Sequence, residues 1–248
     1  MSIKVSDPNS KSNSGFIWAL VVLLAIVAAV IGYIVWNGQN AKTEHLAERE
    51  VEQVAMTMEY DPEDPAVVLS SDKADKDTKT FDLYEDASCP HCSELAEATD
   101  ADMKTAIEAG EINVAIHPLS FLDGKDFENQ DGHSTKAVAA LLAAAQAGDA
   151  TTYWNLRKVI FEQQQDIYNK WTMSDFANAA KELGADSKTV KAIEDADLKE
   201  AGKAAGANAA KLEKETGKLS SPRVIFEGKD LNSETEPITD WVELAKSK

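Results

Sequence analysis

An uncharged apolar stretch near the amino terminus constrains this chain more than any other feature of its sequence. The residues from Gly15 to Trp36 contain no charged side chain and read GFIWALVVLLAIVAAVIGYIVW. A helix of these 22 residues is about 33 Å long, enough to cross a hydrocarbon core of about 30 Å. Trp18, Tyr33 and Trp36 lie toward its two ends, where amphipathic rings favour the membrane interface. We therefore expect residues 15–36 to form one transmembrane anchor.

A cleaved signal peptide is the alternative interpretation of this stretch. Its apolar part would be about 7–15 residues long and would precede a cleavage site of small residues. The stretch is longer than that, and the sequence NGQN at residues 37–40 is a poor cleavage site. We therefore favour an uncleaved anchor.

The charge balance excludes one class of partner. The chain has 25 basic and 43 acidic side chains, a formal net charge of −18. Binding to nucleic acid needs clustered Lys and Arg to neutralise phosphates. We therefore expect no nucleic-acid partner, and a solvated acidic surface suffices to explain the charge.

The chain contains only two cysteines, and they lie two residues apart in the motif Cys89-Pro90-His91-Cys92. Pro90 suits the first turn of a helix, where its missing N–H costs nothing. A cysteine at a helix N-terminus has a lowered thiol pKa, because free N–H groups and the helix dipole stabilise its thiolate. This spacing is typical of thiol–disulfide exchange.

Two other interpretations of the cysteine pair are weaker. Half of a zinc site would need two more ligands, and the four histidines at positions 45, 91, 117 and 133 have no paired spacing. A purely structural disulfide would close so small a ring that it would constrain little of the unfolded chain. We therefore expect no metal.

The side of the membrane on which the cysteines lie follows from two arguments. Lysines occur on both sides of the anchor, so the positive-inside bias is weak. A short polar tail (residues 1–14) before the anchor and a large acidic part after it favour a cytoplasmic amino terminus. A two-cysteine motif in an otherwise cysteine-free body suits an oxidising compartment. We expect a single-pass protein of the cell membrane with an extracytoplasmic C-terminal domain.

Periodicity predicts an alternation of strands and helices after the anchor. Residues 37–65 read as a stalk or linker, helical over 41–58. Strands are expected at 66–69, 80–84, 112–119 and 224–226, the last followed by a turn at 227–230 and an edge strand at Leu231. Helices are expected from Pro90 to Gly110, at 135–147 (capped by Ser134), at 151–164, from Ser174 to about 184, from Ser187, at 197–216 and at 237–245. This order predicts an α/β, thioredoxin-like sheet with a helical insertion at about 133–217.

Over residues 66–248 the sequence resembles the DsbA-like thiol–disulfide oxidoreductases. The run YEDASCPHC at 84–92 is similar to the strand-to-helix active site of that family, and CPHC is the motif of its oxidising members. The run LSSPRVIFEGK at 219–229 is similar to the family's cis-proline loop and following hairpin. A single-pass anchor before such a domain is common in Gram-positive relatives.

The resemblance implies a redox-active disulfide, Cys89–Cys92, as the only redox group, with no other cofactor. Cys89 would be the exposed thiol that forms a mixed disulfide with substrate, and Cys92 the buried partner. Pro222, expected to be cis, would place its loop against the cysteines and offer backbone groups of Ser221 to an extended substrate. A protonated His91 would stabilise the Cys89 thiolate further.

Several neighbouring residues complete the prediction. We expect the carboxylates of Glu85 and Asp86 to turn to solvent, so that they do not oppose the thiolate. Relatives often carry a buried acid six residues before the first cysteine, but Leu83 is there, and Asp82 should point to the other face. The residue before the cis-proline is commonly Val or Thr and is Ser221 here. His117 is interpreted as structural, Trp154 and Phe161 as core, Arg223 as a surface residue, and the loop 121–133 has no assigned role.

The favoured function is an anchored thiol oxidase that introduces disulfides into unfolded or reduced secreted proteins. The resemblance implies a quinone-linked reoxidant in the membrane. A reductase or isomerase on the same fold is the nearest alternative, because the reduction potential decides the direction. The alternative from another class is an anchored, non-catalytic binding module or chaperone that uses the groove beside Pro222.

Overall fold

The computed structural model describes residues 14–231 and 238–248, so the predicted tail lies outside the described residues except for Ser14. The chain divides into two units, residues 1–42 and 43–248. In the first unit, α1 (Ser14–Ala41) is the one described helix that is long and apolar enough to cross a membrane. Its span Phe16–Tyr33 has a mean hydropathy of 2.7. The predicted anchor, residues 15–36, lies within this helix.

The segment after the anchor differs from our prediction of a helix over 41–58. A 3-10 helix, η1 (Glu44–Glu48), is followed by irregular chain and by strand β1 (Thr57–Asp61). The side chain of Leu46 is 1% exposed, although we expected it on a solvated stalk. The apolar side chains that suggested an amphipathic helix instead pack on the domain, and such tertiary contacts override helix propensity.

Polar contacts fix the same segment to the rest of the second unit. The carboxylate of Glu52 accepts a hydrogen bond from the indole Nε1 of Trp154 at 3.2 Å. Arg49 forms an ion pair with Glu162 at 2.6 Å. The folded unit therefore begins at Thr43, and most of the predicted linker 37–65 belongs to it.

Six strands form one mixed sheet in the order β1-β2-β4-β3-β5-β6. The remaining strands are β2 (Asp64–Ser70), β3 (Lys79–Asp86), β4 (Ile112–Leu119), β5 (Arg223–Phe226) and β6 (Lys229–Asp230). Strands β3 and β4 are parallel, and the other neighbours are antiparallel. The central strand β3 ends at Asp86, three residues before Cys89. The cysteine pair therefore lies at the carboxyl end of this strand.

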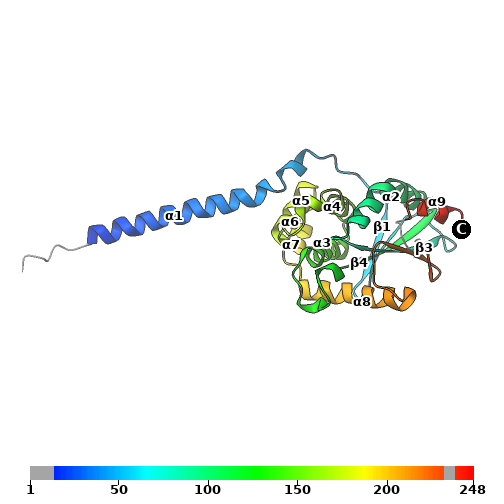
Figure 1. The fold of residues 1–248 in the computed structure, drawn as a ribbon. Coiled ribbons are helices and arrows are strands. Elements are labelled where there is room, and N and C mark those ends of the chain that lie inside the picture. Colours follow the sequence, from blue (N-terminus) through cyan, green and yellow to red (C-terminus); the bar gives the residue numbers. More distant parts are fainter. Residues whose placement is uncertain (1–13, 232–237) are drawn as a thin grey trace, which may run out of the picture. The chain divides into compact units, whose positions relative to one another are not determined.

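Helices cover both faces of the sheet. Helices α2 (Pro90–Ala109) and α9 (Trp241–Lys246) lie on one face and α8 (Leu198–Thr216) on the other (Figure 1). The period-two pattern of β3 explains this arrangement. Phe81 packs near Trp241 of α9, with ring centroids 6.2 Å apart, whereas Tyr84 packs with Leu212 of α8.

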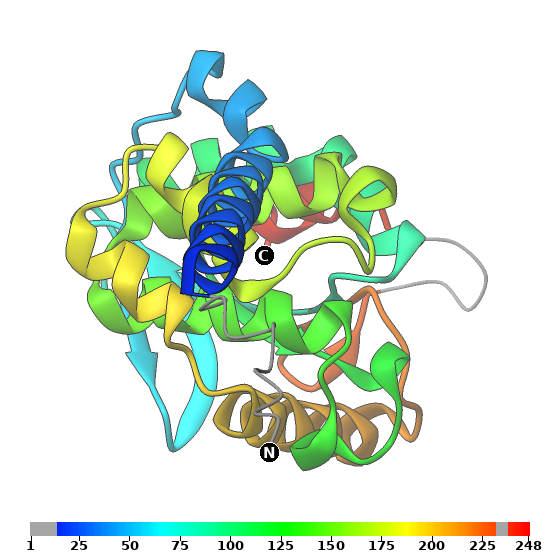
Figure 2. The same ribbon diagram turned by 90° about the vertical axis from the view of Figure 1, so that its left-hand side faces the viewer.

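The helical insertion between β4 and β5 is present as predicted. It consists of α3 (His133–Ala147), α4 (Ala150–Glu162), α5 (Gln164–Ile167), α6 (Met173–Glu182), α7 (Ser187–Glu194) and α8, and Figure 2 shows it from the side. Two predicted caps are each wrong by two residues. Gly132 precedes α3 in place of Ser134, and Thr172 with Asp175 forms a capping box at α6 in place of Ser174. The last helix begins at Trp241, and Pro237 lies outside the described residues.

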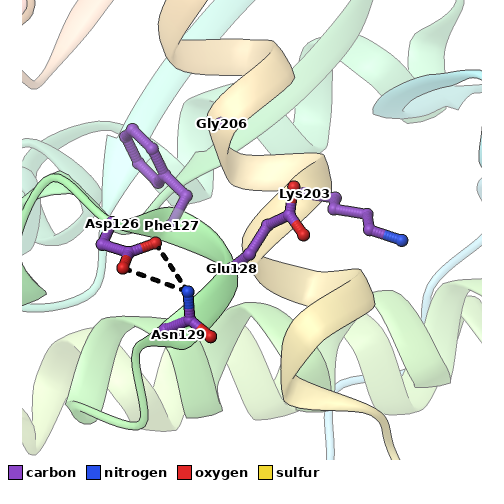
Figure 3. A pocket seen from close by; sticks show the side chains of 6 residues that line it. All are labelled: Asp126, Phe127, Glu128, Asn129, Lys203 and Gly206. Atoms are coloured by element: carbon purple, nitrogen blue, oxygen red, sulfur yellow. Dashed lines mark hydrogen bonds between the residues drawn. The ribbon is translucent and has the colours of Figure 1, made fainter.

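The loop 121–133, which had no assigned role, contains two short 3-10 helices, η2 (Phe121–Asp123) and η3 (Phe127–Asn129). Two glycines let η3 approach α8 closely. A Cβ atom at Gly202 would stand 1.8 Å from the carbonyl oxygen of Phe127, and the Phe127 side chain lies beside Gly206 (Figure 3). None of the predicted site residues lines the pocket at this contact.

Candidate active site

The two cysteines lie where strand β3 gives way to helix α2. Cys89 is the N-cap of α2 and Pro90 its first residue, as predicted. The side chain of Cys92, one turn further on, is 2% exposed. Cys89 is only 7% exposed, less than we expected, because it packs in one cluster with Phe161, and its Sγ lies 3.3 Å from the carbonyl oxygen of Ser221. Both cysteines are free thiols in this structure.

The loop before β5 closes over Cys89. The Ser221–Pro222 peptide bond is cis, as predicted. The Cys89 thiol donates its hydrogen bond to the Ser221 carbonyl oxygen. Arg223 is not the simple surface residue we expected, because its Nε and Nη2 donate to Ser220 Oγ and its Nη1 donates to Asp230 at 2.6 Å. This guanidinium joins the cis-proline loop to the following hairpin.

The surroundings favour ionisation of Cys89. A hydrogen bond from the Cys92 thiol lowers the pKa of Cys89 to about 6, against the opposing effect of burial. The Ser221 side chain and the backbone N–H groups of Cys92 and His91 act in the same direction. These amides belong to the first turn of α2, as expected for a cysteine at a helix N-terminus.

The His91 imidazole pairs with a carboxylate on its own helix. It is exposed, and its Nδ1 lies 2.8 Å from a carboxylate oxygen of Glu94. This hydrogen bond raises the pKa of His91. The backbone N–H of His91, rather than its ring, is thus the group of this residue that contributes most to the low pKa of Cys89.

Cys92 has the opposite electrostatic character. Burial raises the pKa of its thiol well above the ordinary value. Its sulfur accepts a long hydrogen bond, 3.4 Å, from the backbone N–H of Asp86. Near neutral pH the Cys89 thiol therefore ionises readily, whereas the Cys92 thiol keeps its proton.

Our prediction that Glu85 and Asp86 turn to solvent is wrong. Glu85 is 5% exposed and Asp86 is fully buried. Arg157 of α4, itself buried, donates to both carboxylate oxygens of Glu85 at 2.7 Å and to Asp100 of α2 at 2.7 Å. The carboxylate of Asp86 accepts hydrogen bonds from the Ser134 hydroxyl and the Ser88 N–H. Polar partners inside the protein, rather than water, therefore satisfy these acids.

Helices α4 and α5 support the site in a way that the sequence did not reveal. The Gln164 side-chain amide donates to the carbonyl oxygens of Ala87 and Cys89, at 2.8 and 3.0 Å. Phe161, predicted as core, lies in one buried cluster with both cysteines. No local pattern marks these residues, because their function depends on contacts with a segment about seventy residues earlier.

The opposite face of β3 has a structural role. Asp82 points to this face, as predicted, and accepts a hydrogen bond from the fully buried His117 at 2.6 Å. His117 also stacks on Tyr84 and contacts Asn208, in agreement with a structural role. Among the residues that the structure describes, no group of three or more His, Cys, Asp or Glu side chains is arranged to hold a metal ion.

The low pKa of Cys89 gives a direct prediction. We expect the thiolate absorbance of the reduced protein to titrate near pH 6, rather than at about 8.5 as for a free cysteine, and to vanish in Cys89→Ala. Because the pKa is lower in the folded than in the unfolded state, the thiolate stabilises the reduced fold fully above about pH 8.5. This contribution is lost as the pH falls through about 6. A titration midpoint at or above pH 8 would contradict the assignment.

Comparisons with known proteins agree with this geometry. A family model described as thioredoxin matches residues 72–243. The MdbA protein of Corynebacterium diphtheriae, a thiol-disulfide oxidoreductase, is 45% identical with a TM-score of 0.74, over 80% of this chain and 98% of its own. The MdbA protein of Corynebacterium matruchotii is 42% identical with a TM-score of 0.74, over 82% and 98%.

Two matches of lower sequence identity do not indicate a shared activity. Reduced DsbA from Mycobacterium tuberculosis is 17% identical with a TM-score of 0.54, over 73% of this chain and 98% of its own, which shows a shared fold alone. Among curated proteins, the serine/threonine-protein kinase PknE of Mycobacterium tuberculosis is 28% identical over 118 residues, or 46% of this chain. This chain spans 20% of the length of that kinase.

Proposed function

Because the chain belongs to the thioredoxin family and is a thiol–disulfide oxidoreductase, we propose that it works in the oxidising direction and passes a Cys89–Cys92 disulfide to secreted proteins. The observation that carries this proposal is the low pKa of Cys89, about 6. An environment that stabilises the thiolate stabilises the reduced enzyme, and this makes the disulfide a stronger oxidant.

The site residues have distinct roles in the proposed reaction. A substrate thiolate attacks Cys89, the disulfide to Cys92 breaks, and a mixed disulfide between substrate and Cys89 forms. A second substrate thiolate then attacks the substrate sulfur and releases Cys89 as its stabilised thiolate. Two electrons have then passed from the substrate thiols to the cysteine pair.

In our proposal four supporting residues position the Cys89 sulfur and its hydrogen-bond partners. Pro90 begins α2 without an unsatisfied N–H, and the N–H of His91 faces the Cys89 sulfur. The cis Pro222 presents the Ser221 carbonyl oxygen to the thiol. In the mixed disulfide the Ser221 carbonyl oxygen, no longer bonded to the Cys89 thiol, would accept a hydrogen bond from an extended substrate peptide beside Cys89.

The location and partners follow from the anchor and the chemistry. We propose that α1 holds the protein in the cell membrane, with the C-terminal domain on the extracytoplasmic side, where unfolded or reduced secreted proteins are its substrates. An oxidase must pass on the two electrons that it takes from each substrate. A quinone-linked reoxidant in the same membrane would accept them, and the anchor would keep the domain within its reach.

The reduction potential, measured by equilibration with glutathione, tests the direction. We expect a value close to the roughly −120 mV of a strong oxidant rather than the roughly −270 mV of thioredoxin. A thioredoxin-like value would make the protein a reductase or isomerase. Oxidation of a reduced, unfolded substrate no faster than by Cys89→Ala would overturn the proposal. Full cellular function without either cysteine would instead indicate a binding module or chaperone.

A further inference from the structure

The Cys89 thiolate depends on a backbone N–H group that has two possible acceptors. The N–H of Cys92 donates to the Cys89 carbonyl oxygen at 3.0 Å, and it also stabilises negative charge on the Cys89 sulfur. Donors shared in this way are common at helix ends. The more strongly the carbonyl oxygen attracts this N–H, the less the N–H stabilises the sulfur. The partners of the Cys89 carbonyl group therefore affect the chemistry of its thiol.

Gln164 supplies another donor to this carbonyl oxygen. Its Nε2 donates to the Cys89 carbonyl oxygen at 3.0 Å and to the Ala87 carbonyl oxygen at 2.8 Å. Carbonyl oxygens only accept hydrogen bonds, so these two acceptors fix the orientation of the side-chain amide, with its NH2 group toward the cysteine motif. Gln164 is buried, so bulk water does not compete freely for the two bonds. Both N–H groups of the amide are thus used on the backbone around Cys89.

The break between α4 and α5 places Gln164 against the motif. Helix α4 ends at Glu162, and Gln163, with φ −104° and ψ 17°, leaves helical geometry before α5 begins at Gln164. Just before the break, the carbonyl oxygen of Phe161 accepts a hydrogen bond from Ser93 Oγ of α2 at 2.7 Å. A contact other than its own therefore helps to hold the Gln164 amide in place beside α2.

We propose that Gln164 is a positioning residue, which binds both carbonyl groups and so leaves the Cys92 N–H to the Cys89 sulfur. The inference rests on the proposed function, because it concerns the release of Cys89 from a substrate. In that step a second substrate thiolate bonds to the substrate sulfur, the bond from that sulfur to Cys89 breaks, and its electron pair stays on Cys89. Gln164 favours this leaving thiolate through the backbone, and it thereby makes the disulfide a stronger oxidant.

The charged side chains around Cys89 have other partners. On α2, the exposed His91 imidazole pairs with Glu94. On α4, the guanidinium of Arg157 binds two buried carboxylates, and on β3 the carboxylate of Asp86 accepts hydrogen bonds from two serines. A neutral substitution at position 164 changes none of these charges. A change in the titration of Cys89 in such a variant therefore reports the loss of the amide.

The titration of Cys89 tests the proposal. Gln164→Met keeps the length of the side chain and removes both donors. In the reduced full-length protein in detergent, we expect the thiolate absorbance to titrate about one pH unit above the wild-type midpoint near pH 6, because one net hydrogen bond changes an equilibrium by up to about tenfold. The equilibrium with glutathione at pH 7 should move about fivefold toward the oxidised protein, since the reduced form loses part of its thiolate stabilisation.

Gln163→Met is the matched control. Gln163 is the neighbouring residue, but its Oε1 lies 3.0 Å from His45 Nε2 and serves a different contact. We expect this variant to keep the wild-type midpoint. Gln164→Asn is the second test variant, because it keeps an amide but is one methylene too short to reach both carbonyl oxygens. It should raise the midpoint in the same direction as Gln164→Met.

Two outcomes would overturn the role of Gln164. The first is a folded Gln164→Met protein with the wild-type titration, which would mean that Gln164 only packs. The second, which decides if that variant does not fold, is a Gln164→Asn midpoint equal to that of Gln163→Met. The titration uses no substrate, so it is independent of the direction of the cellular reaction. A wild-type potential like that of thioredoxin, together with a raised midpoint in Gln164→Met, would overturn the proposed function and keep the role of Gln164.

Discussion

A Cys92→Ala variant is expected to accumulate covalent complexes with substrate proteins that the wild-type protein resolves. Its Cys89 thiolate keeps the stabilising amides of α2 and attacks the disulfide of a substrate protein that is already oxidised, which reverses the release step and forms a mixed disulfide. No second sulfur remains in the site to displace the substrate. Oxidation of reduced substrate should fall to the uncatalysed rate, because without Cys92 the protein has no disulfide of its own to pass on. The covalent complexes are measured on non-reducing gels, and they should disappear when dithiothreitol reduces the mixed disulfide.

Cys89→Ala is the matched control for this experiment. It keeps a cysteine in the motif, but the remaining Cys92 is buried and holds its proton, since burial raises its pKa. We expect neither complexes nor turnover from this variant. Equal amounts of complex with the two variants would show that Cys89 is not the group that meets the substrate.

Local chemistry explains which parts of the fold and site the sequence predicts well. Pro90 begins α2, and Gly110 ends it in a left-handed conformation, because each residue satisfies a backbone requirement at its own position. The alternation in β3 places Phe81 and Tyr84 on opposite faces of the sheet in the same local way. These features need no knowledge of distant residues.

The errors concern side chains whose partners come from elsewhere in the chain. Glu85 and Asp86 read as solvent-exposed acids, because burying a carboxylate is costly unless a partner satisfies it. The partners are Arg157, 72 residues away from Glu85, and Ser134, 48 residues away from Asp86. Nothing near position 85 indicates them. The segment after the anchor was misread for the same reason, since Leu46 is buried by contacts that its own periodicity does not show.

The second large prediction concerns Arg157, which pairs with the buried carboxylates of Glu85 and Asp100. Arg157→Met is expected to lower the free energy of unfolding by about 3–5 kcal/mol, since breaking a buried ion pair leaves uncompensated charge. Glu85 and Asp100 would both stay buried without their cation. Methionine keeps the length and most of the apolar contacts of the arginine side chain. Urea unfolding followed by circular dichroism measures the loss.

Lys158→Met separates this effect from the loss of any cation on α4. Lys158 is the next residue, and it pairs with Glu52 at a partly exposed position. Such a pair is worth about 0–1 kcal/mol, so this substitution should cost no more than that. Burial raises the pKa of Asp100 to about 6 even with the guanidinium in place. The guanidinium lowers this pKa, so without Arg157 the Asp100 carboxyl group should take up its proton at a still higher pH, and the difference in the free energy of unfolding between the variants should narrow as the pH falls toward about 6. Equal losses in the two variants at pH 7 would mean that water or a shift of β3 replaces the guanidinium, and that Arg157 does not hold the acids beside the cysteines.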